Sequence, residues 1–230
     1  MKPTPSLAPA SSGRSNHARW AGLAYIVVII AAGFAQGGVR ERLVVDGNAA
    51  ETAANILEHA FLFKFGLASD LLAFMADALV AVLLWYVLRP AGRTLATAAA
   101  TFRLIAHPAI GSLNLLNHYM ALEVLQHPEL VPGSAPDLAL QFMDLHSMGY
   151  LIAGAFFGVS LILTGILMAR MHFFPRLLAV LTGLAGVAYL METFGMVLYP
   201  SAEAVWVGAV MVFAVAAEVP LALWLAIRRA

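Results

Sequence analysis

The chain has 230 residues, of which 62% are hydrophobic and only 11% are charged. Soluble domains are roughly half apolar and about a quarter charged, so this chain has too little polar material to cover a water-exposed surface. Its 13 basic and 13 acidic residues balance, which gives a nucleic-acid partner no basic surface to bind. Because the sequence contains no cysteine, disulfides, thiolate nucleophiles and cysteine-ligated metal centres are excluded. The composition predicts a membrane protein whose main partner is the lipid bilayer.

The N-terminal segment 1–19 is rich in proline, serine and alanine, which predicts a disordered tail. The first apolar run follows at about 20–35. A cleaved signal peptide is the alternative interpretation, because a basic stretch precedes the run and small residues end it. Five further apolar segments follow in the chain, and this favours a retained membrane helix.

The segment 36–64 is polar and is expected to lie at the outer surface between the first and second spans. Asp46 and Gly47 mark a turn. Asn48 and Glu51 have the spacing of a capping box, which predicts a short helix over about 49–59. Alanine and leucine recur there at helical spacing, so this helix is expected to lie on the membrane with its apolar face down.

A membrane-spanning helix needs about 20 mainly apolar residues. Five further segments meet this requirement, at about 65–88, 94–122, 143–169, 177–199 and 204–227. Together with 20–35 they predict an all-α, six-helix membrane bundle that forms one domain over 20–230. The connection before the fourth span contains Pro128, Pro132 and Pro136, so it is not expected to form one helix.

Charge predicts how this bundle is oriented. One side carries most of the basic residues: Lys2, Arg14, Arg19, Arg89, Arg93, Arg170, Arg176, Arg228 and Arg229. The opposite side has Arg40, Arg42 and Lys64 but carries nearly all acidic residues of the connecting segments. Basic residues concentrate on the cytoplasmic side of membrane proteins. Both termini are therefore expected in the cytoplasm.

Charged residues near the middle of the membrane form the first candidate site. Asp70 and Asp77 lie seven residues apart, so they face the same way about 10 Å apart along one helix. Arg103 comes out level with Asp77, and Glu218 lies close in depth. We expect Arg103 to pair with Asp77 or, failing that, with Glu218. Such a pair either joins three helices structurally or takes part in a proton or ion relay.

A second candidate site lies in the outer half of the bundle. Its members are polar or ionisable residues at similar depth: Asp70, Asn114, His118, His146, Tyr150 and Glu192. Ionisable groups are costly inside a membrane, so their convergence predicts a functional cluster that opens outward. Structural roles are the alternatives: Asp144 as the cap of the fourth span, His118 as an interfacial histidine, and Asn114 as a hydrogen bond between helices.

Three classes of function fit these residues. The first is a protein that binds or transports a small solute, ion or proton through the outward-facing cluster. The second is an intramembrane enzyme or redox protein that uses a metal or haem, although the histidines lack the diagnostic spacing of either kind of site. The third is a non-catalytic partner subunit. Nucleotide-binding loops, serine elbows and the His-Glu-x-x-His motif do not occur in the sequence.

Several short segments between Trp20 and Tyr199 are distinctive when taken together. They are Val39-Arg40-Glu41-Arg42-Leu43, Ala53-Ala54-Asn55-Ile56-Leu57, Ala68-Ser69-Asp70-Leu71-Leu72, Phe102-Arg103-Leu104, Asn114-Leu115-Leu116-Asn117, Asp144-Leu145-His146-Ser147-Met148-Gly149-Tyr150, and Phe174-Pro175-Arg176 through Tyr189-Leu190. This set resembles a bacterial membrane family, domain-of-unknown-function family 4386. The resemblance implies a multi-pass protein of the bacterial cytoplasmic (inner) membrane and supplies no activity.

The resemblance extends to most of the candidate site residues. Those that fall on positions resembling the family pattern are Asp70, Asp77, Arg103, Asn114 and His146. Glu192 stands where the family favours an acid. His107 and His118 depart from the pattern, which weakens any haem site that needs either of them as a ligand.

Overall fold

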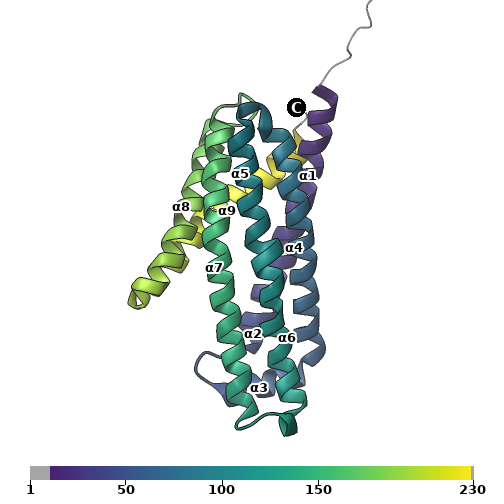
Figure 1. Cartoon of the computed structure of the whole chain (residues 1–230), viewed down its shortest axis with the longest axis vertical. Helices are drawn as coiled ribbons and strands as arrows, with labels where there is room; N and C mark the ends of the chain where they lie inside the picture. The colour runs from purple at the N-terminus through teal and green to yellow at the C-terminus, as the bar shows by residue number, and fades with distance from the viewer. Residues whose placement is uncertain (1–10, 229–230) are drawn as a thin grey trace, which may run out of the picture.

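The computed structural model describes residues 11–228, which are almost entirely helical and contain no strand (Figure 1). The longer helices are α1 (Ser11–Gly33), α3 (Ala49–Glu58), α4 (Ala60–Leu88), α5 (Arg93–Leu104), α6 (Ser112–Gln126), α7 (Ala135–Ala169), α8 (Arg176–Leu198) and α9 (Glu203–Ile227). The shorter elements are the α-helical α2 (Glu41–Leu43), the π-helical η1 (Phe34–Arg40) and η3 (Ile105–Gly111), and the 3-10 turns η2 (Arg89–Ala91), η4 (Pro128–Leu130) and η5 (Pro200–Ala202).

Five helical stretches are long and apolar enough to cross a membrane: Asn16–Leu43, Ala60–Ala91, Ala135–Ala169, Arg176–Leu198 and Pro200–Ile227. The protein is therefore a multi-pass membrane protein built as a helical bundle. The predicted third span, 94–122, lies within one continuous helical run formed by α5, η3 and α6. That run is not among the five, because polar side chains such as Arg103, His107 and Asn114 lower its hydropathy.

The first helix differs from the sequence-based expectation at both ends. It begins at Ser11, inside the segment expected to be a disordered tail, and the first ten residues of that tail lie outside the described residues. Through η1 and α2 it continues to Leu43, beyond the expected end at residue 35. Gly37, Gly38 and Arg40 suit a polar loop in the sequence. In the structure a π-helical turn keeps the chain helical, and Arg40 points into the bundle, where it is buried.

The helix expected as the fourth span also begins earlier than predicted. α7 starts at Ala135, and the Ser134 side chain caps it by accepting a hydrogen bond from the Asp137 N–H at 3.3 Å. Pro136 falls in the first turn, where its missing N–H costs nothing. The interpretation of Asp144 as the N-cap was therefore wrong, since Asp144 lies in the body of α7.

The long axis of the bundle is formed by α1, α4, α7 and the run from α5 to α6 (Figure 1). α9 returns across the bundle to pack against α1, while α8 packs on α7 and leans away from the bundle toward its C-terminal end. The beginning of α1, the α4–α5 and α7–α8 connections and the end of α9 lie at one end of the bundle. α2 and α3 lie at the other end. Asn48 caps α3 as the capping box predicts, accepting from the Glu51 N–H at 3.1 Å.

Close helix packing explains why small residues interrupt the apolar runs. A Cβ atom added at Gly186 on α8 would lie 2.4 Å from the carbonyl oxygen of Gly158 on α7. Only glycine permits this approach, which is common between membrane helices. The main core joins α1, α4 and α9 through residues that include Tyr25, Val80 and Leu221.

Candidate functional site

The first polar cluster, which we call the Arg40 cluster, consists of Arg40, Asp70 and Tyr150 from η1, α4 and α7. The Arg40 guanidinium forms an ion pair with the Asp70 carboxylate. The Tyr150 hydroxyl donates a hydrogen bond to the other Asp70 oxygen at 2.8 Å. Arg40 also lies over the Tyr150 ring, with its Cζ atom 5.1 Å from the ring centroid. Because Asp70 is completely buried, these contacts supply the partners that a carboxylate needs in an apolar surrounding.

The local backbone explains how Arg40 reaches the bundle interior. The π-helical turn η1 ends at Arg40, and such turns shift the side chains that follow relative to a regular α-helix. Val39 then packs directly on Gly66 of α4, where an added Cβ would lie 2.9 Å from a Val39 methyl group. The Arg40 Nε donates to the exposed Gln36 side chain at 2.8 Å. The cluster therefore has a polar connection to the surface.

The second polar cluster, the Arg103 cluster, lies two turns further along α4. It contains Asp77, Arg103, His107, Tyr25 and Glu218. The Arg103 Nε donates to Asp77 Oδ1 at 2.8 Å, and its Nη2 lies 2.5 Å from the same oxygen. His107 Nδ1 lies 3.5 Å from Asp77 Oδ2. Both members of the ion pair are buried, so the pair satisfies two charges that would each be costly alone.

Glu218 joins this cluster through tyrosine hydroxyl groups rather than through Arg103 directly. The Tyr25 hydroxyl donates to Glu218 Oε2 at 2.7 Å, and the Tyr189 hydroxyl donates to Oε1 at 3.0 Å. Arg103 Nη1 lies 3.5 Å from the Tyr25 oxygen, and its Cζ lies 4.4 Å from the Tyr25 ring centroid. Tyr25 therefore bridges the arginine and the glutamate.

A second π-helical turn, η3, contains His107. Pro108 lies inside this turn and supplies no N–H for a helical hydrogen bond, which explains why the regular helix is interrupted here. The His107 ring lies 4.8 Å from the Phe157 ring and stacks at 5.9 Å on Phe74. π-helical turns often occur at functional sites. Within residues 11–228, one π-helical turn holds Arg40 and the other holds His107, which contacts Asp77.

Aromatic rings separate the two clusters. The His107 and Tyr150 ring centroids are 6.3 Å apart, and Phe74 lies 5.9 Å from each ring. Asp70 and Asp77 thus face the same side of α4, and each carboxylate holds an arginine from a different helix.

His118 and His146 form a third group, which we call the histidine pair. Their ring centroids are 5.5 Å apart and the rings are nearly perpendicular. Asn114 donates from Nδ2 to the His146 carbonyl oxygen at 2.7 Å and accepts from Asn117 at 2.9 Å. α6, which carries Asn114, and α7, which carries His146, meet closely here because residue 149 is glycine. An added Cβ would lie 2.1 Å from Asn114 Oδ1. His146 also lies 5.1 Å from the Tyr150 ring, next to the Arg40 cluster.

The structure brings together five of the six residues expected in the outer cluster: Asp70, Asn114, His118, His146 and Tyr150. Glu192 does not join them. It is half-buried on α8 and forms no hydrogen bond or ion pair with the other described residues. α8 is still packed on α7 at this point, because the neighbouring Thr193 donates to the Leu151 carbonyl at 2.8 Å. The Glu192 side chain nevertheless has no contact with the cluster, so similar depth did not imply contact.

Sequence reasoning missed Arg40, Tyr25 and the role of His107. Arg40 lies outside the first apolar run, and only its place in the Val39–Leu43 motif marked it. Tyr25 is the one phenol within the first apolar run, which is the signal that was available for it. His107 follows Arg103 by four residues, the spacing of helix neighbours, and this spacing was the signal that His107 lies near the Arg103–Asp77 pair.

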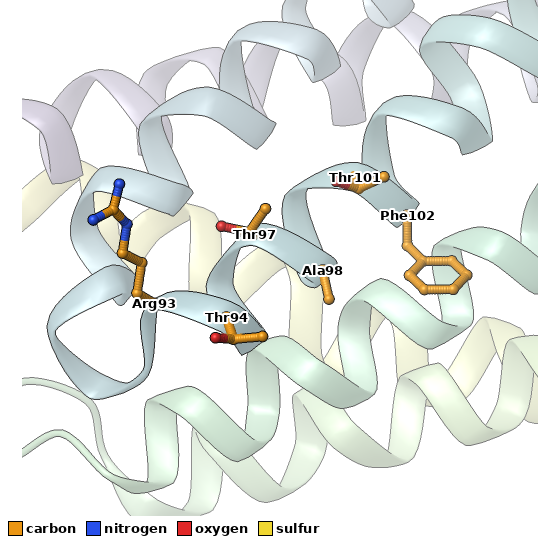
Figure 2. A pocket seen from close by; sticks show the side chains of 6 residues that line it. All are labelled: Arg93, Thr94, Thr97, Ala98, Thr101 and Phe102. Carbon is orange, nitrogen blue, oxygen red and sulfur yellow. The ribbon is translucent and has the colours of Figure 1, made fainter.

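A shallow hollow lies on the surface of α5 (Figure 2). It is lined by Arg93, Thr94, Thr97, Ala98, Thr101 and Phe102. All six belong to one helix, and Thr97 accepts a hydrogen bond from the Trp85 indole N–H at 3.1 Å. The hollow is therefore an uneven helix face rather than an enclosed site. Within residues 11–228, no three histidine, aspartate or glutamate side chains are grouped as metal ligands.

The chain matches a known protein family. The family model described as "Domain of unknown function (DUF4386)" matches residues 20–228. No curated protein and no solved structure matches the chain. The family resemblance inferred from the sequence motifs is thereby confirmed.

Proposed function

This chain belongs to the DUF4386 family, and we propose that it is a proton-handling membrane protein. Its buried network takes up protons at the end of the bundle that holds α2 and α3, and passes them toward Glu218. Two runs of polar contacts carry this proposal. The first joins Arg40, Asp70 and Tyr150. The second leads from His107 to Asp77 and then through Arg103 and Tyr25 to Glu218.

The proposal includes six membrane spans, with the run from α5 to α6 as the third. The connections α4–α5 and α7–α8 lie at the same end of the bundle as the beginning of α1 and the end of α9 (Figure 1). That end carries Arg89, Arg93, Arg170, Arg176 and Arg228. The positive-inside rule supports placing it in the cytoplasm, with α2 and α3 on the outer side of a bacterial cytoplasmic membrane.

Direct contacts favour a proton over a larger solute. The carboxylates of Asp70 and Asp77 are held by arginines, a phenol and an imidazole at hydrogen-bond or ion-pair distance. Carboxylates, phenols and imidazoles all exchange protons. Proton relays in membrane proteins are built from such buried aspartate, glutamate and histidine residues. The 6.3 Å separation of the Tyr150 and His107 rings is the step at which a side chain or a water molecule has to move.

Entry from the outer side is supported by the surroundings of Arg40. The exposed Gln36 side chain accepts from Arg40 at 2.8 Å and donates to exposed Glu41 at 3.4 Å. A proton that reaches Asp70 weakens the ion pair with Arg40. Protonation of Asp70 is thereby linked to the packing of η1 on α4.

The test is proton flux into vesicles that contain the purified protein, driven by an imposed pH gradient and followed with an internal pH-sensitive dye. Wild type and Glu192→Gln are expected to conduct, because Glu192 is a membrane carboxylate outside the network. Asp70→Asn and Asp77→Asn are expected to lose conduction while eluting as folded protein. Absence of flux in wild type, or full flux in both aspartate variants, would overturn the proposal.

A further inference from the structure

The contacts of the histidine pair indicate which nitrogen of each ring carries a proton. His118 Nε2 lies 3.0 Å from the backbone carbonyl oxygen of Phe63. His146 Nδ1 lies 3.2 Å from the backbone carbonyl oxygen of Asn114. A carbonyl oxygen can only accept, so His118 Nε2 is the N–H of its ring. His146 Nδ1 also lies 3.3 Å from Asn114 Nδ2, which donates to the His146 carbonyl at 2.7 Å. We assign the His146 proton to Nδ1 because its contact with the Asn114 carbonyl is the shorter of the two.

The other nitrogen of each ring is therefore a free lone pair. His118 Nδ1 and His146 Nε2 are both buried and have no hydrogen-bond partner among the described residues. The side chains themselves are 0% and 1% exposed. Buried polar atoms are nearly always satisfied, and each exception calls for an explanation such as an ion. Two such atoms on rings 5.5 Å apart point to one shared ligand.

We propose that His118 and His146 form a two-imidazole site for Cu⁺. A histidine that ligates a metal almost always donates its other N–H to a carbonyl, a carboxylate or water, which fixes the ring and its tautomer. Both histidines show this arrangement, each with a backbone carbonyl from a different segment. Because metal–imidazole bonds are about 2 Å long, two rings at this separation can both reach one ion.

The surroundings select a soft, singly charged ion. The nearest buried carboxylate, Asp70, is already engaged by Arg40 and Tyr150, so no anion is left to balance a divalent charge. Zn²⁺ usually takes four ligands, whereas the chain supplies two imidazoles here. Buried Met143 lies one turn before His146 on α7, within the same apolar cluster as Phe63. Its thioether is a donor of the kind that Cu⁺ prefers.

Two substitutions remove the ligand nitrogens and keep the structural hydrogen bonds. Asparagine carries its amide N–H₂ where histidine has Nδ1, so His146→Asn retains a donor toward the Asn114 carbonyl. Glutamine reaches further and carries its amide near the position of Nε2, so His118→Gln retains a donor toward the Phe63 carbonyl. His172→Gln is the matched control, because His172 is exposed in the α7–α8 connection.

The experiment is a titration of the purified full-length protein with Cu⁺ under anaerobic conditions, in competition with a coloured Cu⁺ chelator. Wild type and His172→Gln are expected to bind one Cu⁺ per chain, with nitrogen ligation visible by X-ray absorption. His118→Gln and His146→Asn are expected to bind at least tenfold more weakly. The inference is overturned if wild type takes up no Cu⁺, if the absorption spectrum shows no nitrogen ligands, or if both variants bind as tightly as wild type.

Discussion

The Tyr25 hydroxyl on the first span donates a 2.7 Å hydrogen bond to Glu218 on the last span, 193 residues away. α1 and α9 are packed against each other along this line. The same hydroxyl faces Arg103 on α5. The Tyr25 hydroxyl therefore connects the first and last spans to the Arg103–Asp77 ion pair.

Replacing Tyr25 with phenylalanine tests how much this connection contributes. The variant Tyr25→Phe leaves one Glu218 oxygen without a donor in a buried position, which is expected to cost about 1–3 kcal/mol. Tyr199→Phe is the control, because Tyr199 is 67% exposed near the end of α8. Thermal unfolding of both variants in detergent measures the difference, and equal midpoints would show that the Tyr25 bond contributes nothing.

The Arg103–Asp77 pair allows its structural and functional roles to be separated. Asp77→Leu alone leaves a buried, unpaired arginine and is expected to cost about 3–5 kcal/mol, whereas replacing both partners with apolar residues is often neutral. The double variant Asp77→Leu/Arg103→Met is therefore expected to regain most of the stability of wild type in denaturant unfolding.

Proton flux in the same double variant separates the two roles. A stable double variant without flux indicates that the pair is required for proton flux. A stable double variant with normal flux would mean that the pair only joins helices, and the proposed relay would then be wrong at this point.

The sequence predicted the elements that depend on hydrophobic length and local capping. Runs of about 20 apolar residues gave four of the later spans, and the Asn48–Glu51 spacing gave α3. The ends of α1 and α7 were missed for identifiable reasons. A buried arginine and a proline in a first turn look like loop residues in a linear sequence, and only the tertiary contacts of Arg40 and the cap at Ser134 show otherwise.

The candidate site was likewise predicted only in part from the sequence. Helical spacing placed Asp70 and Asp77 on one side of α4, and the structure places an arginine against each. Glu192 was grouped with them by depth alone, which does not say which way a side chain faces. The π-helical turns at Arg40 and His107 change the direction of the side chains, and regular helical periodicity does not reveal such turns.

Gly149→Ala tests the close contact between α6 and α7. The added methyl group would lie 2.1 Å from Asn114 Oδ1, so Asn114 has to move and its bond to the His146 carbonyl is lost. We expect a loss of about 1–3 kcal/mol in unfolding free energy. Gly208→Ala is the control, because a Cβ at Gly208 meets nothing within 4 Å. If the contact is the cause, adding Asn114→Ala should recover part of the loss, giving a non-additive pair.

Arg40→Lys tests whether charge alone is enough at the Arg40 cluster. Lysine keeps the positive charge beside Asp70. It loses the planar group that donates from Nε to Gln36 and lies over the Tyr150 ring, and arginine and lysine are not equivalent where both kinds of contact are made. A loss of about 1–2 kcal/mol is expected, from one hydrogen bond and one cation–π contact. Arg42→Lys, next to it in α2 but exposed, is the control and should unfold like wild type. Equal stability of Arg40→Lys and wild type would show that only the charge of residue 40 matters.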